Sequence, residues 1–464
     1  MTIQKTPNQI NVEKMLERMA EIDNISPTMC TAKWLQSTVY LMNGFTHSCH
    51  HPTSHKIPLE EIKRNPSALH NTEFKKVQRE KMLSGERPEE CQYCWNIEDL
   101  PGKHISDRTY KSTDLMWSTP YVDKVIKASH TENIAPTYLE VAFENTCNFK
   151  CAYCTPDISS KWMEEVKQYG PYNTSSKTGN LDWIKQEGRM PIPNREYNPY
   201  IEAFWKWWPE LYENLETFRI TGGEPLLSKN TWDILEYVAK NPRKNFTLAI
   251  NSNMDVPAEF IDRLIDYYKK ISPNIKAFQI FTSCEATGDA ANYIRFGMNY
   301  KRFMKNVERM LTETDARINF MVTFNALSIT TFENFLNDIW NLRVTFNEDD
   351  ADNRIPMMIS YLRWPKFMSA TILPQELKEK YGNKYISFVR AHARNTSPSK
   401  AGRFYLEEID QIDRLCEFMA KEPDTINRDR RDFVIFFNEY DKRRKTNFNE
   451  TFPELKDMKD GWSL

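Results

Sequence analysis

From about Tyr138 onward, short β-type runs alternate with amphipathic helical stretches, and this alternation constrains the fold more than any other feature of the chain. It is typical of parallel strands joined by crossover helices. The candidate strands are YLEVAF (138–143), TFRIT (217–221), FTLAIN (246–251), AFQIFTS (277–283), INFMVTF (318–324) and MMISYL (357–362). Six strands favour an α/β fold with an open, partial (β/α)6 TIM-like barrel, whose chemistry lies at the carboxyl ends of the strands.

The rest of the chain divides around this core. Residues 1–115 lack the alternation and are expected to form a separate small module, followed by a core at 130–365 and a charged, helical extension at 366–464. Residues 155–199 are rich in Gly, Pro, Asn and Ser, and part of this stretch is expected to be a long loop or lid over the strand ends. The basic runs RDRRD and DKRRK near the carboxyl end are interpreted as a solvated face.

Charge and hydropathy exclude several classes of partner. The 62 basic and 64 acidic residues leave a formal charge of only -2, so no global field recruits nucleic acid or an anionic membrane. The amino-terminal segment 1–14 is polar, and no apolar run reaches the ~20 residues that span a bilayer. We therefore expect a soluble, cytoplasmic protein without a membrane or nucleic-acid partner.

Cysteine is concentrated in the first third of the chain. Nine cysteines without a secretion signal favour metal ligation over a disulfide framework. The stretch CNFKCAYC places Cys147, Cys151 and Cys154 on a loop just after the first strand. Three thiolates can hold three irons of a cubane cluster and leave the fourth iron open, whereas a closed zinc site needs a fourth ligand that no neighbouring Cys or His supplies.

Two motifs together resemble the radical S-adenosylmethionine (SAM) superfamily. The first is the Cx3Cx2C spacing, with aromatic Tyr153 directly before the last cysteine. The second closes the second strand, where that superfamily has a GGEP motif against the methionine part of SAM; its residues here are Thr221, Gly222, Gly223, Glu224 and Pro225. The resemblance implies a 4Fe-4S cluster on the three cysteines and SAM as the second cofactor.

Further residues are similar to the family's SAM contacts. Asn251 and Asn253 end the third strand, where relatives approach the ribose and carboxylate of SAM. Ser283 ends the fourth strand, and Arg295 follows where relatives often contact the SAM carboxylate. Each asparagine could instead cap a turn, and Arg295 could be a solvated helix charge. No residue is assigned as a catalytic acid or base.

The amino-terminal module resembles the auxiliary-cluster module called twitch, which is related to the SPASM domain. Its candidate ligands are Cys30, Cys49, Cys91 and Cys94, enough to close a second iron-sulfur cluster. The module precedes the core instead of following it, and His50 and His51 stand beside Cys49. Zinc held by Cys49, Cys91, Cys94 and a histidine is therefore the alternative. His47 and His55 are interpreted as solvated loop residues.

Two isolated cysteines and one aromatic helix have structural interpretations. Cys416 is expected to pack on the apolar face of a helix. Cys284 follows the fourth strand and is interpreted as a buried small hydrophobe, with hydrogen donation to a substrate radical as the alternative. The run FWKWWPEL is interpreted as core packing rather than a base-stacking surface.

The resemblance implies an enzyme that reductively cleaves SAM to methionine and a 5′-deoxyadenosyl radical, which abstracts hydrogen from a substrate. Its electron donor would be a protein such as flavodoxin or ferredoxin. Family analogy places modification of a peptide or protein side chain first, and oxidation of a small sugar-like or nucleotide-like molecule second. The alternative from another class is a zinc-dependent protein that binds nucleic acid or a partner.

Overall fold

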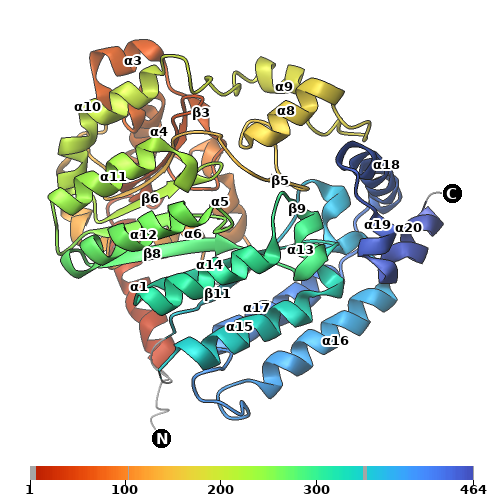
Figure 1. The fold of residues 1–464 in the computed structure, drawn as a ribbon. Helices are drawn as coiled ribbons and strands as arrows, with labels where there is room; N and C mark the ends of the chain where they lie inside the picture. The colour runs from red at the N-terminus through yellow and green to blue at the C-terminus, as the bar shows by residue number, and fades with distance from the viewer. Residues whose placement is uncertain (1–6, 103, 349–352, 463–464) are drawn as a thin grey trace, which may run out of the picture. The chain divides into compact units, whose positions relative to one another are not determined.

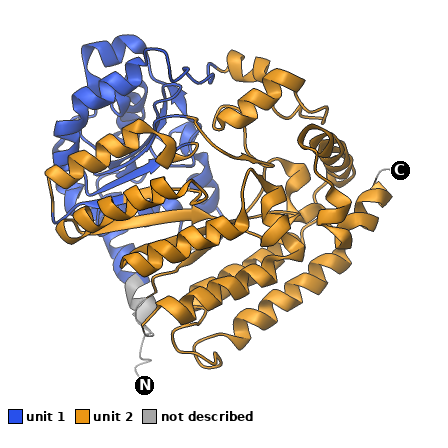
Figure 2. Ribbon diagram, in the orientation of Figure 1, with its two compact units in different colours: residues 1–144, 188–222, 244–248 blue, residues 145–187, 223–243, 249–464 orange. Residues whose placement is uncertain are grey.

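The computed structural model describes residues 7–102, 104–348 and 353–462, so the first six residues of the polar amino-terminal segment lie outside the described part. The chain forms two compact units, coloured separately in Figure 2. The first unit comprises residues 1–144, 188–222 and 244–248, and the second comprises 145–187, 223–243 and 249–464. The predicted division at 115, 130 and 365 is drawn on sequence composition and stays a prediction.

The first unit contains five strands in the spatial order β3-β2-β1-β4-β6. They are β1 (Gln36–Tyr40), β2 (Phe45–His47), β3 (His55–Lys56), β4 (Tyr138–Ala142) and β6 (Thr217–Thr221). The pairs β1/β4 and β4/β6 are parallel, whereas β1/β2 and β2/β3 are antiparallel. The helices of this unit are α1 (Pro7–Asp23), α2 (Ala32–Leu35), α3 (Leu59–Arg64), α4 (Glu73–Leu83), α5 (Gln92–Glu98), α6 (Asp107–Ser112), α7 (Val122–Lys127) and α10 (Pro199–Asn214).

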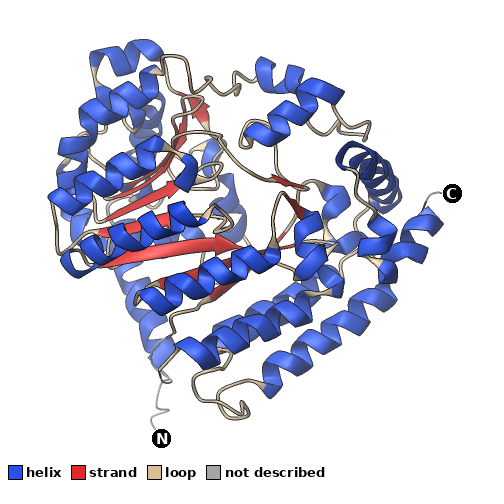
Figure 3. Ribbon diagram, in the orientation of Figure 1, coloured by secondary structure: helices blue, strands red, loops and turns tan. Residues whose placement is uncertain are grey.

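The second unit contains three parallel strands in the order β8-β10-β11, and helices make up most of its remaining elements (Figure 3). They are β8 (Ala277–Ser283), β10 (Arg317–Phe324) and β11 (Met357–Tyr361). A separate antiparallel pair joins β5 (Lys150–Cys151) and β9 (Arg295–Phe296), and β7 (Thr247–Asn251) has residues in both units.

The helices of the second unit include three that lie side by side in Figure 1, namely α14 (Tyr300–Glu313), α15 (Phe332–Phe346) and α16 (Gln375–Ala391). The others are α8 (Ser160–Tyr169), α9 (Leu181–Gln186), α11 (Lys229–Lys240), α12 (Ala258–Ile271), α13 (Gly288–Ile294), α17 (Leu406–Met419), α18 (Ile426–Arg444), α19 (Phe448–Thr451) and α20 (Lys456–Trp462). None of the described helices is long and apolar enough to cross a membrane.

The parallel strands have one apolar and one more polar face. In β8, Phe278 and Ile280 are buried while Gln279 and Ser283 are only half-buried, and β10 alternates in the same way. Successive strand residues point to opposite faces of a sheet, so one face packs against helices and the other offers polar side chains. The helices supply the matching apolar stripe, as in α12, where buried residues recur at helical spacing.

The structure confirms the six strands predicted from Tyr138 onward, each within one residue at either end. It also confirms the α/β class, since parallel pairs occur in both units. Closure into a partial barrel stays a prediction. The stretch expected to contain a long loop includes two helices, α8 and α9, and the amino-terminal part contributes β1 to the parallel sheet, which the sequence analysis missed.

The interpretation of the carboxyl-terminal basic runs is wrong for several residues. Arg444 is fully buried on α18, and Asp429 and Asp432 of the first run are buried on the same helix. They are buried because α18 packs against other parts of the second unit on more than one side, which charge content alone does not indicate. The aromatic α10 packs as expected, with Phe204, Trp208 and their apolar neighbours buried.

Candidate functional site

The three cysteines of the loop after β4 lie close together in the second unit. Cys151 belongs to β5, and each of the three residues is half-buried. Burial, followed by the charge of the neighbouring Cys151, raises the pKa of Cys147 to about 12. Burial and the charges of Cys151 and Cys147 raise the pKa of Cys154 well above its usual value. The loop therefore brings three thiols within electrostatic reach of one another.

A buried ion pair lies beside these thiols. Arg295 stands opposite Cys151 in the β5/β9 pair, and its Nη1 is 4.0 Å from the Cys151 Sγ. The guanidinium also forms an ion pair with Glu285, with 2.6 Å between Nη2 and Oε2, and Glu285 accepts a hydrogen bond from the Tyr153 hydroxyl at 3.2 Å. Arg295, expected from sequence as a SAM contact, is thus engaged by a carboxylate that the sequence analysis missed. The available signal was the acidic residue just after the end of β8.

Side chains from α8, from the residue before it and from α18 hold the backbone of the cysteine loop. The Trp162 indole N–H donates to the Cys151 carbonyl at 2.7 Å, and Ser159 Oγ donates to the Phe149 carbonyl at 2.7 Å. Arg444, the last residue of α18, donates through Nη1 to the Lys150 carbonyl at 2.6 Å. The loop conformation is thereby fixed from outside the loop.

The TGGEP turn can be built only with glycine at its two central positions. Gly222 has a φ of +122°, and a Cβ there would lie 2.8 Å from the Glu144 carbonyl oxygen. A Cβ on Gly223 would lie 2.2 Å from the carbonyl oxygen of Thr146, just before Cys147. Backbone therefore approaches backbone directly, and the Glu224 N–H donates to the Thr146 carbonyl at 2.7 Å.

Glu224 joins the ends of two strands. Its buried carboxylate accepts hydrogen bonds from the Leu226 N–H (3.0 Å), the Ser252 hydroxyl (2.8 Å) and the Asn253 N–H (2.6 Å). Burial raises its pKa to about 7 even though these bonds favour the charged form. The Asn253 amide then donates to the Asn148 Oδ1 at 2.8 Å, which connects this network to the cysteine loop.

The other predicted cofactor contacts are found at strand ends. Asn251 and Ser283 are half-buried at the last positions of β7 and β8. Thr221 ends β6 and its hydroxyl donates to the Val141 carbonyl at 3.4 Å, while Pro225 opens a buried 3-10 turn, Pro225–Leu227. Cys284 is fully buried, with its Sγ 3.2 Å from the Ala286 carbonyl oxygen.

The four amino-terminal cysteines line a single cavity in the first unit. Cys30 precedes α2, Cys49 follows β2, and Cys91 and Cys94 lie at the start of α5. Burial raises the pKa of Cys91 to about 12 and that of Cys94 to about 11. Residues separated by more than sixty positions are thus brought together around one cavity, which Arg108 and Lys111 also line.

Two histidines next to this cavity pair with an acidic residue. Asp107 Oδ2 is 2.5 Å from His51 Nε2 and 3.4 Å from His50 Nε2, and His51 also lines the cysteine cavity. The expectation that His47 and His55 are solvated loop residues is wrong. His47 lies in β2 and is buried, and His55 lies in β3, where its Nε2 contacts the Thr72 hydroxyl at 2.9 Å. Aromatic side chains pack against both rings, Tyr40 against His47 and Phe74 against His55.

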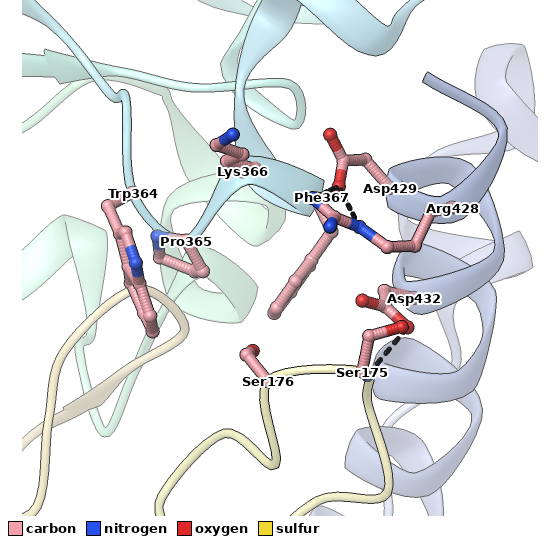
Figure 4. A pocket seen from close by; sticks show the side chains of 9 residues that line it. All are labelled: Ser175, Ser176, Trp364, Pro365, Lys366, Phe367, Arg428, Asp429 and Asp432. Carbon is pink, nitrogen blue, oxygen red and sulfur yellow. Dashed lines mark hydrogen bonds and ion pairs between the residues drawn. The ribbon is translucent and has the colours of Figure 1, made fainter. Parts of the chain in front are cut away.

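A further pocket lies in the second unit, shown in Figure 4. There Asp432 of α18 accepts hydrogen bonds from the Ser175 N–H at 2.9 Å and hydroxyl at 3.0 Å, and Arg428 contacts Asp429. None of the residues that line it belongs to the cysteine loop or the TGGEP turn. The hydrogen bonds from Ser175 to Asp432 connect the segment after α8 to α18.

Comparison with protein families identifies a domain in the part of the chain that holds these residues. Residues 141–339 match the family model of the Radical SAM superfamily. The chain carries a radical SAM domain. It is therefore a radical SAM enzyme that depends on a 4Fe-4S cluster and binds SAM. The matched residues include the cysteine loop, the TGGEP turn and Arg295. A search of curated proteins gives no match.

The residues present fit the cluster. Three thiols share one loop, a guanidinium lies 4.0 Å from one of them, and the loop carbonyls are anchored by Arg444 and Trp162. A nearby cation stabilises thiolates, which are the ligands that iron-sulfur clusters require. Because Gly223 packs against the Thr146 carbonyl, no side chain separates the TGGEP turn from the cysteine loop at this point.

Proposed function

We propose that this radical SAM enzyme abstracts hydrogen from carbon in a peptide or protein side chain. When bound, the cluster supplies the electron that cleaves SAM into methionine and a 5′-deoxyadenosyl radical. Transfer of a hydrogen atom from substrate carbon then gives 5′-deoxyadenosine and a carbon-centred substrate radical. The observation that carries the proposal is the meeting of the three-cysteine loop with the glycine turn at Thr146.

The chain's own residues bind and orient the two cofactors in this proposal. Cys147, Cys151 and Cys154 are the cluster ligands, and Arg295 and Trp162 hold the loop that carries them. The glycines at 222 and 223 let the turn pack directly against the backbone before Cys147, and we assign this turn to the methionine part of SAM. Further SAM contacts are assigned to Tyr153, Thr221, Glu224, Pro225, Asn251, Asn253, Ser283 and Arg295.

The structure refines the role proposed for Glu224. Its carboxylate already accepts three hydrogen bonds, two of them from backbone N–H groups. We therefore propose that Glu224 holds the TGGEP turn against the residues after β7. Any contact to the SAM ammonium would be made in addition to these bonds. We likewise assign Arg295 a role in holding the cysteine loop. Any contact to the SAM carboxylate would be made in addition to its ion pair with Glu285.

We assign a second iron-sulfur cluster to Cys30, Cys49, Cys91 and Cys94. Their placement around one cavity supports a site in which all four ligands come from the protein. Lys33 is buried nearby. Burial lowers its pKa, but the charges of Cys91 and Glu90 raise the pKa above its ordinary value. A positively charged lysine therefore lies close to these thiols. The twitch-like assignment rests on this ligand set.

Release of 5′-deoxyadenosine tests the proposed function. Anaerobically reconstituted protein, supplied with dithionite and SAM, should release 5′-deoxyadenosine, and Cys151→Ala should abolish the release because one cluster ligand is lost. Cys416→Ala is the matched control, since Cys416 packs against Gly382 in the carboxyl-terminal helices. Normal release from Cys151→Ala would contradict the assignment.

Deuterium transfer tests the substrate. Deuterium should pass from a labelled candidate peptide into 5′-deoxyadenosine if a peptide is modified. Transfer only from a pool of small sugar-like or nucleotide-like molecules would favour the second candidate. Reduction by flavodoxin or ferredoxin in place of dithionite would identify the class of electron donor.

A further inference from the structure

A second cavity in the first unit lies on the polar face of the sheet. It is lined by Gln36 and Thr38 of β1, Glu140 of β4, Arg219 of β6 and Lys111 of α6, among others. We propose that this cavity binds the substrate and recognises a zwitterionic amino-acid group, either free or at the end of a peptide. The inference rests on the proposed function, because it names the substrate class on which that chemistry would act.

The register of the strands explains why these side chains meet. Thr38 stands opposite Glu140, and Glu140 stands opposite Arg219, across two parallel pairs. Residues directly opposite one another project from the same face of a sheet. On the other face of β4, Leu139 and Val141 are buried. The cavity is therefore built on one continuous polar surface of three strands.

Two acceptors in the cavity lack a partner from the protein. Gln36 is 7% exposed, and its Oε1 has no hydrogen-bond donor among the described residues. The Glu140 carboxylate is only half-buried; it makes no hydrogen bond or ion pair with the described residues and stands opposite Arg219 across the β4/β6 pair. Leaving a buried acceptor unsatisfied costs about 1–3 kcal/mol, so this end of the cavity favours a ligand with N–H donors and a positive charge, such as an α-ammonium group.

Lys111 can supply the positive charge that the carboxylate end of a zwitterion requires. The Lys111 ammonium makes no hydrogen bond or ion pair within the described ranges, although Asp107 lies near it and is engaged by His50 and His51. Lys111 lines both this cavity and the cavity of the four cysteines. A carboxylate bound by Lys111 would thus lie next to the proposed auxiliary cluster site.

The remaining lining distinguishes an amino acid from other polar ligands. The carboxylates Asp107, Asp114 and Glu140 outnumber the cations Lys111 and Arg219, which disfavours a nucleotide carrying several negative charges. A neutral sugar would supply no counter-charge for Glu140 or Lys111. Aromatic walls, with 5.7 Å between the ring centroids of Trp117 and Tyr138, offer apolar contact for a side chain.

Calorimetric titration tests the inference on reconstituted full-length protein in the presence of SAM. One arm uses the standard free α-amino acids, a second uses tripeptides with free termini, and a third uses the N-acetyl amides of the same amino acids. At least one free amino acid or free-ended tripeptide should bind, and its capped form should bind at least about tenfold more weakly. Comparison of the first two arms distinguishes a free amino acid from a peptide end.

Variants locate the binding to this cavity. Glu140→Gln and Lys111→Met should each weaken the best probe by about tenfold or more, because each removes the counter-charge for one end of the zwitterion. The exposed pair Glu60 and Lys63 on α3 supplies the matched controls Glu60→Gln and Lys63→Met, which should bind as the wild type does. Thermal unfolding of each variant verifies that it is folded.

Three outcomes would overturn the inference: no probe binds, capped probes bind equally well, or neither cavity variant weakens binding. SAM-dependent release of 5′-deoxyadenosine, measured in the same preparations without any probe, keeps the two proposals separate. Release without zwitterion binding would leave the radical chemistry standing and remove this site. Zwitterion binding without release of 5′-deoxyadenosine would leave this binding site standing and contradict the proposed radical chemistry.

Discussion

At the scale of single residues, Glu224 shows how a motif residue serves the architecture of its site. Its carboxylate is buried and joins a backbone N–H of its own turn to Ser252 and Asn253 at the end of β7. One side chain therefore connects the TGGEP turn to the residues that follow β7. A carboxylate buried without a cationic partner has a raised pKa, here about 7, because the charged form is poorly solvated.

The raised pKa of Glu224 predicts a pH-dependent stability. Because the folded chain retains this proton up to about pH 7, whereas an unfolded glutamate releases it near pH 4.3, the free energy of unfolding should fall by about 3 kcal/mol as pH rises between these values. Glu224→Gln, neutral at every pH, should lack this fall. Urea unfolding of the metal-free chain at several pH values measures the difference; a wild-type-minus-variant difference that is constant from pH 4 to 8 would contradict it.

At the scale of elements, α18, a long helix near the carboxyl end, contributes to the cysteine loop. Arg444 ends α18, bonds to the Lys150 carbonyl, and forms an ion pair with Glu165 of α8 at 3.0 Å. Glu165 also binds Lys150 Nζ at 2.6 Å and accepts a hydrogen bond from the Tyr172 hydroxyl at 2.6 Å. The buried carboxylate is thus satisfied by three segments, and α18 supplies one of them.

Removing this arginine should loosen the loop. Arg444→Met would leave Glu165 partly uncompensated in a buried site and free the Lys150 carbonyl, with an expected cost of about 3 kcal/mol in the free energy of unfolding. The variant should also retain less iron after reconstitution. Lys442→Met on the same helix is the control, because Lys442 is 81% exposed. Equal stability and iron content in both variants would show that α18 does not hold the loop.

At the scale of the whole molecule, each compact unit carries its own set of cysteines. Cys147, Cys151 and Cys154 belong to the second unit, whereas Cys30, Cys49, Cys91 and Cys94 belong to the first. Metal loading of one set can therefore be measured while the other is removed by substitution.

Anaerobic reconstitution should give about eight irons per chain, with four at each cysteine set. The triple variant Cys147→Ala, Cys151→Ala, Cys154→Ala should retain about half, and Cys91→Ala with Cys94→Ala should lose the other half. Iron and zinc are measured together by elemental analysis. If the triple variant holds zinc and no iron, the amino-terminal site is a zinc site and the auxiliary cluster is excluded.

Parts of the fold and site could be predicted because their signals are local. The strand TFRIT and the turn TGGEP adjoin in sequence, so a β-type run ended by glycines is enough to place the motif at a strand end. Strand β1, QSTVY, was missed because its side chains are mostly polar; the buried Ser37 is satisfied by Thr46, not by apolar contact. Arg444 was missed because its partners, Lys150 and Glu165, are distant in sequence.

The sequence by itself determined the α/β class, the order of the strands and the three-cysteine loop, since hydrophobic periodicity and motif spacing are properties of short segments. Only the tertiary structure decided that four scattered cysteines share a cavity, that Arg295 is held by Glu285, and that β1 lies beside β4. The cysteine cavity and the β1/β4 pair depend on contacts between residues far apart in the chain, and the Arg295–Glu285 pair depends on the side-chain geometry after β8. Which buried charges find partners is settled only when packing brings such segments together.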